Sequence, residues 1–289
     1  MGALPIKERG TSELKKVPIL LARHVVLIFI SIMMVFPFLW MVVSALKTKD
    51  EIWQFPPTLW PEKPMWNHFT EAWSMAPFDQ YIFNSVFTAT GIVLIQIVNS
   101  ALIAYAFTQL RFKGRNLLFG IILISYMLPV AATYVPSYVI LADFHLLDTY
   151  KGLILSNACS VFGIFLFRQA FLQLPKELIE AGRVDGATHW TIIWRIIFPT
   201  TKATFITFAL ISFVQNYNSY LWPTLITTSE SKMLITTGLR QFFIQEGAYG
   251  IQWPLIMAAS AFAVLPLLIL FIFVQKWIIS GISDQGLKG

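Results

Sequence analysis

From residue 180 the chain reads Glu180-Ala181-Gly182-Arg183-Val184-Asp185-Gly186-Ala187, and it continues to Ile196-Ile197-Phe198-Pro199. This short charged segment lies between two long apolar runs, 152–167 and 203–229. A polar element between two membrane spans is not expected to lie in the hydrocarbon of the bilayer, because charged groups are costly there. The sequence therefore predicts that this segment contacts a soluble partner.

The composition indicates a helical membrane protein. Of the 289 residues, 56% are hydrophobic and only 12% are charged, which is too apolar for a soluble domain of this length. Charge-free windows long enough to cross about 30 Å of hydrocarbon recur along the chain, without the alternation of a β-barrel. We predict an all-α fold with six transmembrane helices, at Val25–Leu46, Tyr81–Leu110, Asn116–Ala142, Gly152–Phe167, Ala203–Ser229 and Gly247–Gln275.

The basic residues predict that both ends are cytoplasmic. With the N-terminus inside, 15 of the 21 Lys and Arg fall in cytoplasmic segments, as the positive-inside rule requires. The predicted organisation is a basic tail (1–24), a six-span permease domain (25–280) with a cytoplasmic element at 170–202, and a tail (281–289). Because this topology and attraction to anionic lipid account for the net charge of +6, no nucleic-acid partner is expected.

The cytoplasmic element is predicted to contain two short helices. Pro175 is typical of a helix start, and Asp185-Gly186 is typical of a helix end because Gly tolerates the left-handed conformation. Thr188 is a suitable cap for the second helix. The first helix is predicted to be amphipathic, with one apolar side (Leu178, Ile179, Ala181) and one charged side (Glu177, Glu180, Arg183).

Such a helix suits docking in a groove of a partner. Glu180 and Asp185 would offer carboxylates to basic groups there, and the small Ala181 and Gly182 would permit close approach. The alternative is an interfacial connector that touches only lipid. Acidic side chains are poorly suited to anionic headgroups, so the docking interpretation is favoured.

The same residues resemble a family pattern. Permease subunits of bacterial ATP-binding-cassette importers carry Glu-Ala-Ala, three residues, Gly, nine residues, Ile, one residue, Leu-Pro. This chain keeps every spacing and departs only by Gly182 for Ala and Phe198 for Leu. The stretch 217–223 (Tyr-Asn-Ser-Tyr-Leu-Trp-Pro) is similar to the Trp-Asn-x-x-Leu-Trp-Pro segment of carbohydrate-importer permeases. The C-terminal tail looks like that of the smaller permease of the maltose importer, and the similarity extends from about residue 20 to the end.

The resemblance implies a type I importer permease with a coupling helix that sits on a cytoplasmic ATPase. The residues it assigns to coupling are Glu180, Ala181, Gly182, Asp185, Gly186 and Ala187. It also implies a second permease subunit in a heterodimer, two ATPase subunits and an extracytoplasmic sugar-binding protein, in a bacterial inner membrane. ATP and Mg would bind to the ATPase, and this chain would bind no cofactor and would not be an enzyme. The residues agree, since the sequence has no phosphate-binding Gly-x-x-x-x-Gly-Lys-Ser/Thr motif and no metal-ligand spacing among its four histidines.

Polar residues within the spans are predicted to line the translocation path, because they are costly against lipid. Helical spacing places Gln215, Asn218, Ser219 and Trp222 on one face of the fifth span, and Asn99 and Tyr126 are candidates in the second and third spans. Aromatic rings and amides suit a carbohydrate, and a neutral one is favoured because no buried unpaired cation awaits an anion. Polar bonding between helices remains the alternative for these residues.

Other function classes fit less well. An ion-coupled secondary carrier or channel would need carboxylates inside the membrane, whereas every Asp and Glu falls outside the predicted spans. A membrane enzyme would need an acidic or metal cluster at one surface. The single Cys159 excludes an intrachain disulfide. We therefore expect a permease subunit that forms half of the path of an ATP-driven sugar importer, with the secondary carrier as the alternative.

Overall fold

A computed structural model of the chain describes residues 16–248 and 252–286, and all regular secondary structure in these ranges is helical. The predicted all-α fold is thus confirmed. The chain divides into two compact units. The smaller unit contains the described part of Met1–Ala72 with Ile251–Ala261, and the larger contains Trp73–Gly250 with Phe262–Gly289.

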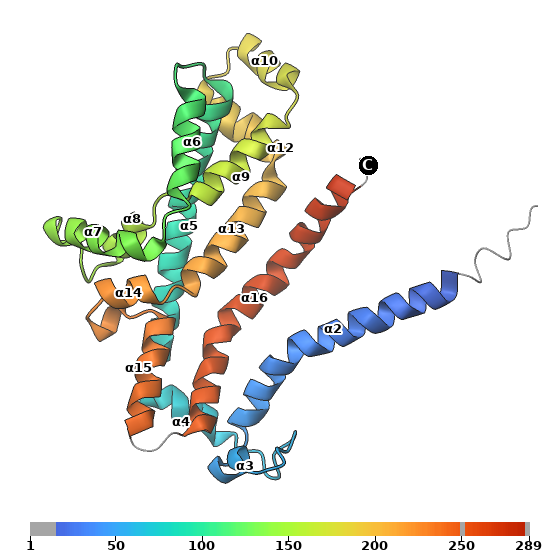
Figure 1. The fold of residues 1–289 in the computed structure, drawn as a ribbon, viewed down its shortest axis with the longest axis vertical. Helices are drawn as coiled ribbons and strands as arrows, with labels where there is room; N and C mark the ends of the chain where they lie inside the picture. The colour runs from blue at the N-terminus through green and yellow to red at the C-terminus, as the bar shows by residue number, and fades with distance from the viewer. Residues whose placement is uncertain (1–15, 249–251, 287–289) are drawn as a thin grey trace, which may run out of the picture. The chain divides into compact units, whose positions relative to one another are not determined.

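The described helices follow one another along the chain as shown in Figure 1. In order they are α2 (Lys16–Ala45), α3 (Lys49–Trp53), α4 (Asn67–Met75), α5 (Phe78–Gln109), α6 (Arg115–Ser125), α7 (Val130–Asp143), α8 (Tyr150–Ser156), α9 (Val161–Leu172), α10 (Lys176–Val184), α11 (His189–Thr191), the π-helix η1 (Ile192–Ile197), α12 (Phe198–Thr200), α13 (Lys202–Tyr217), α14 (Leu221–Ile226), the 3-10 helix η2 (Glu230–Lys232), α15 (Ile235–Ala248) and α16 (Trp253–Gly286).

Among the described residues, three helices are each long and apolar enough to cross a bilayer, at Leu20–Ala45, Phe78–Gln109 and Trp253–Lys276. Three bent helix pairs bring the number up to six if each pair is one span. The bends are 99° between α6 and α7, 50° between α8 and α9, and 85° between His189–Thr200 and α13. The predicted tails at 1–24 and 281–289 lie partly outside the described residues, and within them α2 already begins at Lys16 while α16 continues to Gly286.

Three predicted spans were wrong in being drawn as continuous helices. The span 152–167 is interrupted after Ser156, where α8 ends, and resumes as α9 at Val161. The span 116–142 is interrupted after Ser125, because Pro129 disfavours helical backbone at the residue before it and begins α7 as its N-cap. The span 203–229 is interrupted after Tyr217. Pro223 has no N–H to donate to the Ser219 carbonyl, and its ring would clash with that carbonyl in a continuous helix. Helix α13 ends before Ser219, and Pro223 lies near the start of the separate helix α14.

The core of the larger unit is built where α5, α9 and α13 pack side by side (Figure 1). Its centre is a group of buried phenylalanines, in which the rings of Phe167 and Phe205 stack with centroids 4.2 Å apart. Phe171 and Phe208 extend this group toward both sides. Because lipid tails are as apolar as these rings, close van der Waals packing rather than expulsion from water holds the helices together.

The turn between α7 and α8 is fastened to the segment that contains η2. Asp148 Oδ1 accepts hydrogen bonds from the backbone N–H groups of Thr228 and Ser229, each at 3.0 Å, and Ser229 Oγ donates to Asp148 Oδ2. Lys232 Nζ forms an ion pair with Asp148 Oδ2 at 3.4 Å. On the other side of η2, Asn84 of α5 donates to the carbonyl oxygens of Ser231 (3.0 Å) and Met233 (2.9 Å). These bonds hold the connection between α14 and α15 to α5 and to the turn between α7 and α8.

The smaller unit is organised around a buried lysine. Lys47 Nζ donates to the carbonyl of Thr58 and lies 4.5 Å from the centroid of the Trp40 ring. A capping box at the start of α3 joins Thr48 and Glu51, with Thr48 N–H donating to Glu51 Oε2 at 2.6 Å. The charge of Lys47 is therefore satisfied within the unit and is not available to a ligand.

Candidate functional site

Helix α10 and the turn after it have the geometry that the sequence predicts. Pro175 is the N-cap residue and Asp185 is the C-cap residue. Gly186 follows with φ of 77°, a left-handed conformation that favours glycine. Ala187 N–H donates to the Gly182 carbonyl at 2.9 Å and Gly186 N–H donates to the Arg183 carbonyl at 3.1 Å, which is the Schellman arrangement. The predicted helix end at Asp185-Gly186 is confirmed.

The buried side of α10 differs from the predicted apolar side. Ile179 is only 3% exposed and Gly182 is buried, whereas Leu178 and Ala181 are exposed. Residues three apart share a helix face, so Ile179 and Gly182 turn together toward the core. A Cβ added to Gly182 would lie 2.5 Å from Ile196 Cδ1. Gly182 therefore permits close approach within this chain, which corrects its predicted place on the docking surface.

The second arm of the element, residues 188–200, leads from α10 back to α13 and contains an unusual helix. Thr188 caps it as predicted, accepting a hydrogen bond from Thr191 N–H at 3.2 Å. The arm then widens into the π-helix η1, in which Phe198 N–H bonds to the Ile193 carbonyl five residues back. Pro199 has no N–H for the normal helical bond, and its ring would clash with the carbonyl four residues before it. The Phe198-Pro199 pair of the sequence pattern thus accounts for a local widening, a feature that is frequent at functional sites.

Two polar contacts join this element to α5. Tyr105 Oη lies 2.7 Å from His189 Nδ1, and Arg183 Nη2 donates to the carbonyl of Gln109 at 3.4 Å. The sequence offered no spacing signal for either contact, because the partners are more than seventy positions apart. Together with the Gly182–Ile196 contact, they fix α10 to the end of the larger unit, where α5 ends and α6 begins (Figure 1).

The outward side of α10 is charged and unpaired within the described chain. Glu180, Ala181, Asp185 and Gly186 are exposed, and Ala187 is half-buried. Val184, an apolar residue, is 87% exposed. No hydrogen bond or ion pair joins the carboxylates of Glu180 and Asp185 to another described residue. An exposed apolar residue between two free carboxylates is a surface that suits a basic partner.

The second-span candidate Asn99 belongs to a group that holds helices together. Asn99 Nδ2 donates to the Ala158 carbonyl at 3.0 Å, and on the same side of α5 Gln96 Nε2 donates to the Asn157 carbonyl at 2.7 Å. These carbonyls lie in the break between α8 and α9, whose backbone groups have no helical partner. Ser212 Oγ of α13 donates to Gln96 Oε1 at 2.6 Å. The contacts of Asn99 therefore support the alternative interpretation, in which this residue bonds helices together and does not line the path.

The fifth-span candidates do not share one helix face, because α13 ends at Tyr217. Gln215 and Asn218 are exposed and Ser219 is half-buried. Trp222 is only 7% exposed, stacks on Tyr134 with centroids 5.4 Å apart, and donates from Nε1 to Ser156 Oγ at 2.9 Å. The break at 218–220 therefore separates a buried structural tryptophan from two exposed amides, and this corrects the predicted common face.

Tyr126 lies in the break between α6 and α7 and is 65% exposed. Tyr126, Gln215 and Asn218 are the three predicted path residues whose polar side chains are exposed in regions of apolar helix. Groups of this kind are costly against lipid, so they are expected to face water, solute or another subunit. Among the described residues, no three His, Cys, Asp or Glu side chains come together in a way that could hold a metal ion.

Comparisons with known proteins agree with this architecture. The sn-glycerol-3-phosphate transport system permease protein UgpE of Yersinia enterocolitica is 35% identical over 268 residues, which cover 91% of this chain and 95% of that protein. The arabinooligosaccharides transport system permease protein AraQ of Bacillus subtilis is 29% identical over 90% of this chain and 92% of that protein. Both relatives are transport permeases by name.

Solved structures show the same fold. A chain of a bacterial ABC transporter involved in the import of alginate, an acidic polysaccharide, superposes with a TM-score of 0.77 at 21% identity, covering 94% of this chain and 99% of that one. Residues 96–284 match the family described as "Binding-protein-dependent transport system inner membrane component". The predicted permease fold and function are confirmed: this chain belongs to that family, and it is a multi-pass inner-membrane permease of a binding-protein-dependent importer.

Proposed function

We propose that this chain is the permease subunit of an ATP-driven importer and that α10 is the helix through which a separate ATPase drives it. The observation that carries the proposal is the two-sided character of α10. Its inner side, at Ile179 and Gly182, is packed into the larger unit, while Glu180, Val184 and Asp185 are exposed without partners among the described residues. Such a helix is packed against its own chain on one side, and on the other side it has exposed carboxylates that could bind a partner, so it is suited to transmit the movement of that partner.

The attachment of α10 supports rigid transmission. Tyr105–His189 and Arg183–Gln109 are contacts between this element and α5, and the Gly182–Ile196 contact joins α10 to η1, which leads into α13. Packed interiors have discrete arrangements and resist continuous deformation, so a displacement of α10 moves α5 and α13 rather than being absorbed. Closure of an ATPase pair would in this way rock the permease between its two orientations.

The assembly we propose contains a second permease subunit in a heterodimer, two ATPase subunits and an extracytoplasmic sugar-binding protein. ATP and Mg would be bound by the ATPase subunits, which perform the hydrolysis. We place both chain termini and α10 on the cytoplasmic side. The basic residues near α10 support this orientation, since Arg111, Arg115 and Lys176 lie at the same end of the larger unit.

For the cargo, we propose a neutral polyol or oligosaccharide. Gln215, Asn218 and Tyr126 are exposed and uncharged, and amides and phenols exchange hydrogen bonds with hydroxyl groups. The relative from Bacillus subtilis is named for arabinooligosaccharides. A second candidate is a phosphorylated polyol, because the relatives of 33–35% identity are named for sn-glycerol-3-phosphate.

The proposal is tested in proteoliposomes that contain the permease pair, the ATPase and the binding protein. We expect ATP hydrolysis to rise when the binding protein is loaded with its sugar, and Glu180→Gln to abolish this rise while the permease remains inserted. Glu177→Gln is the matched control, because Glu177 is an exposed carboxylate on the same helix. An equal loss in both variants would contradict a specific role for Glu180. A panel of neutral sugars and sn-glycerol-3-phosphate in the same assay separates the two cargo candidates.

A further inference from the structure

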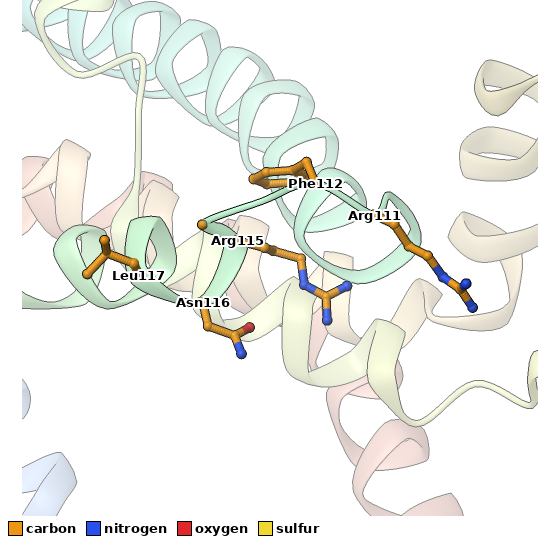
Figure 2. Close-up of a pocket in the computed structure, with 6 residues that line it drawn as sticks. Arg111, Phe112, Arg115, Asn116 and Leu117 are labelled. Carbon is orange, nitrogen blue, oxygen red and sulfur yellow. The ribbon is translucent and has the colours of Figure 1, made fainter.

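Two cavities adjoin each other where α5 ends and α6 begins. The first has a volume of about 480 Å³ and is lined by Arg111, Phe112, Gly114 and Arg115 of the turn and by Asn116 and Leu117 of α6 (Figure 2). The second, of about 450 Å³, lies between the end of α5, the end of α9 and α10. Arg111 and Arg115 line both cavities, so the two spaces share one cationic wall. The second cavity connects this wall to the helix that carries Glu180.

Positive charge dominates the lining. The second cavity has four cationic residues and one carboxylate along its walls: Arg111, Arg115, Lys176, Arg183 and Glu180. Arg115 Nη1 donates to the Leu110 carbonyl at 3.3 Å and Arg183 Nη2 donates to the Gln109 carbonyl at 3.4 Å. These carbonyls form the C-terminal end of α5, where the helix dipole attracts cations.

Capping of α5 explains only part of this cluster. It accounts for one donor each of Arg115 and Arg183, and a guanidinium has five. The side chains of Arg111 and Lys176 form no hydrogen bond or ion pair with any other described residue. A concentration of like charge that the protein does not neutralise itself is stabilised by an anion, and a group with several acceptor oxygens, such as phosphate, matches guanidinium donors best.

The apolar residues around the two cavities favour the phosphate of a lipid over free phosphate. Phe112 and Leu117 line the first cavity beside the two arginines, and Leu117 is 70% exposed. The exposed apolar surface continues along α6 through Leu118, Ile121 and Ile124. A soluble anion gains nothing from such a surface, whereas a phospholipid places its acyl chains next to its headgroup. Basic pockets between membrane helices on the cytoplasmic side are suited to anionic headgroups.

We propose that these cavities bind the phosphate headgroup of an anionic phospholipid, which bridges the turn 111–115 and α10. The headgroup neutralises Arg111 and Lys176 and holds α10 against the end of α5. The inference rests on the geometry of this chain alone and does not require that Glu180 contact an ATPase. An experiment can therefore contradict the lipid-binding proposal without contradicting the ATPase-coupling proposal, and the reverse.

The test uses the full-length protein in detergent and measures lipid binding by native mass spectrometry. Phosphatidylglycerol is compared with phosphatidylcholine of the same acyl chains, for the wild type, for Arg111→Gln combined with Lys176→Gln, and for Lys113→Gln. Lys113 is an exposed cation in the same turn that lines neither cavity, which makes it the matched control. We expect the double variant to bind phosphatidylglycerol roughly tenfold or more weakly, with Lys113→Gln close to wild type. Hydrogen exchange in α10 should slow on adding phosphatidylglycerol only where the two cavity residues are intact.

Three results would overturn the proposal. Equal losses for the double variant and Lys113→Gln would show general surface attraction rather than a site. Displacement of phosphatidylglycerol by inorganic phosphate at millimolar concentration would identify a soluble anion as the ligand. Unchanged lipid binding combined with loss of ATPase association in the double variant would assign these cations to a protein partner.

Discussion

Gly182 of α10 and Ile196 of η1 approach so closely that a methyl group on residue 182 would lie 2.5 Å from Ile196 Cδ1. Both residues belong to the spaced pattern around Glu180 and Pro199, and the fold brings the two arms of that pattern into contact. The colliding atom is the far end of a side chain, so the contact can be relieved by removing that one atom.

Gly182→Ala is predicted to stabilise the protein only when Ile196 is shortened. Alanine gains up to about 1 kcal/mol over glycine in a helix, but in the wild type this gain is offset by the clash with Cδ1. In an Ile196→Val background, which lacks Cδ1, Gly182→Ala should raise the melting temperature. Thermal unfolding of the four proteins in detergent measures the coupling. Additive effects would contradict the contact.

Substitutions at Gly186 should be ranked by backbone conformation rather than by size. A Cβ at this position meets nothing within 4 Å, whereas φ of 77° costs an ordinary residue about 1–2 kcal/mol. We expect Gly186→Asn to retain most coupled ATPase activity and Gly186→Val to lose it, since Asn tolerates the left-handed region. If Gly186→Asn is as damaging as Gly186→Val, the turn does not explain the requirement for glycine.

Asp148 is predicted to stabilise the protein in a pH-dependent way. Burial raises the pKa of its carboxyl group, but hydrogen bonds from the Ser229 side chain and from the N–H groups of Ser229 and Thr228, with the charge of Lys232, bring the pKa down to about 2. Because this pKa is below the unfolded value of about 4, the stabilisation is present above pH 4 and is lost as the pH falls through 2.

Asp148→Asn should therefore lower stability by about 1–3 kcal/mol at neutral pH and should flatten the acid dependence between pH 4 and 2. The measurement is the melting temperature across this pH range. Asp143→Asn is the control, because Asp143 is exposed at the end of α7 and its carboxylate has no hydrogen bond with a described residue. A normal acid dependence in Asp148→Asn would refute the assignment.

Asn218 and Trp222 are predicted to give separable effects. Asn218→Ala should change uptake kinetics across a sugar panel and leave the melting temperature unchanged, because its side chain is exposed and unpaired among the described residues. Trp222→Ala should cost about 3–5 kcal/mol of stability, since it removes a buried ring. Trp222→Phe should restore most of the packing without the bond to Ser156. Unchanged uptake in Asn218→Ala would exclude that residue from the path.

Several local features followed from the sequence because they depend on neighbouring residues. The end of α10 at Asp185-Gly186 and the cap at Thr188 are properties of a few consecutive side chains, and both were predicted correctly. The breaks after Ser125 and after Tyr217 were missed, although Pro129 and Pro223 marked them, and the break between α8 and α9 was missed without a proline to mark it. Apolar composition alone does not distinguish one long helix from two short helices joined at an angle, since both satisfy the membrane equally well.

The chain's composition, the positions of its apolar windows and the pattern around Glu180 were enough to identify an all-helical permease with an exposed charged segment. Only the tertiary structure decided which polar residues serve the fold. Asn99, Trp222, Gln215 and Asn218 all carry an N–H donor on the side chain. Asn99 bonds to the break between α8 and α9 and Trp222 bonds to Ser156, whereas Gln215 and Asn218 remain exposed. The physical reason is that a hydrogen-bond donor of the side chain is satisfied by whichever acceptor the fold brings to it, often from a distant part of the chain.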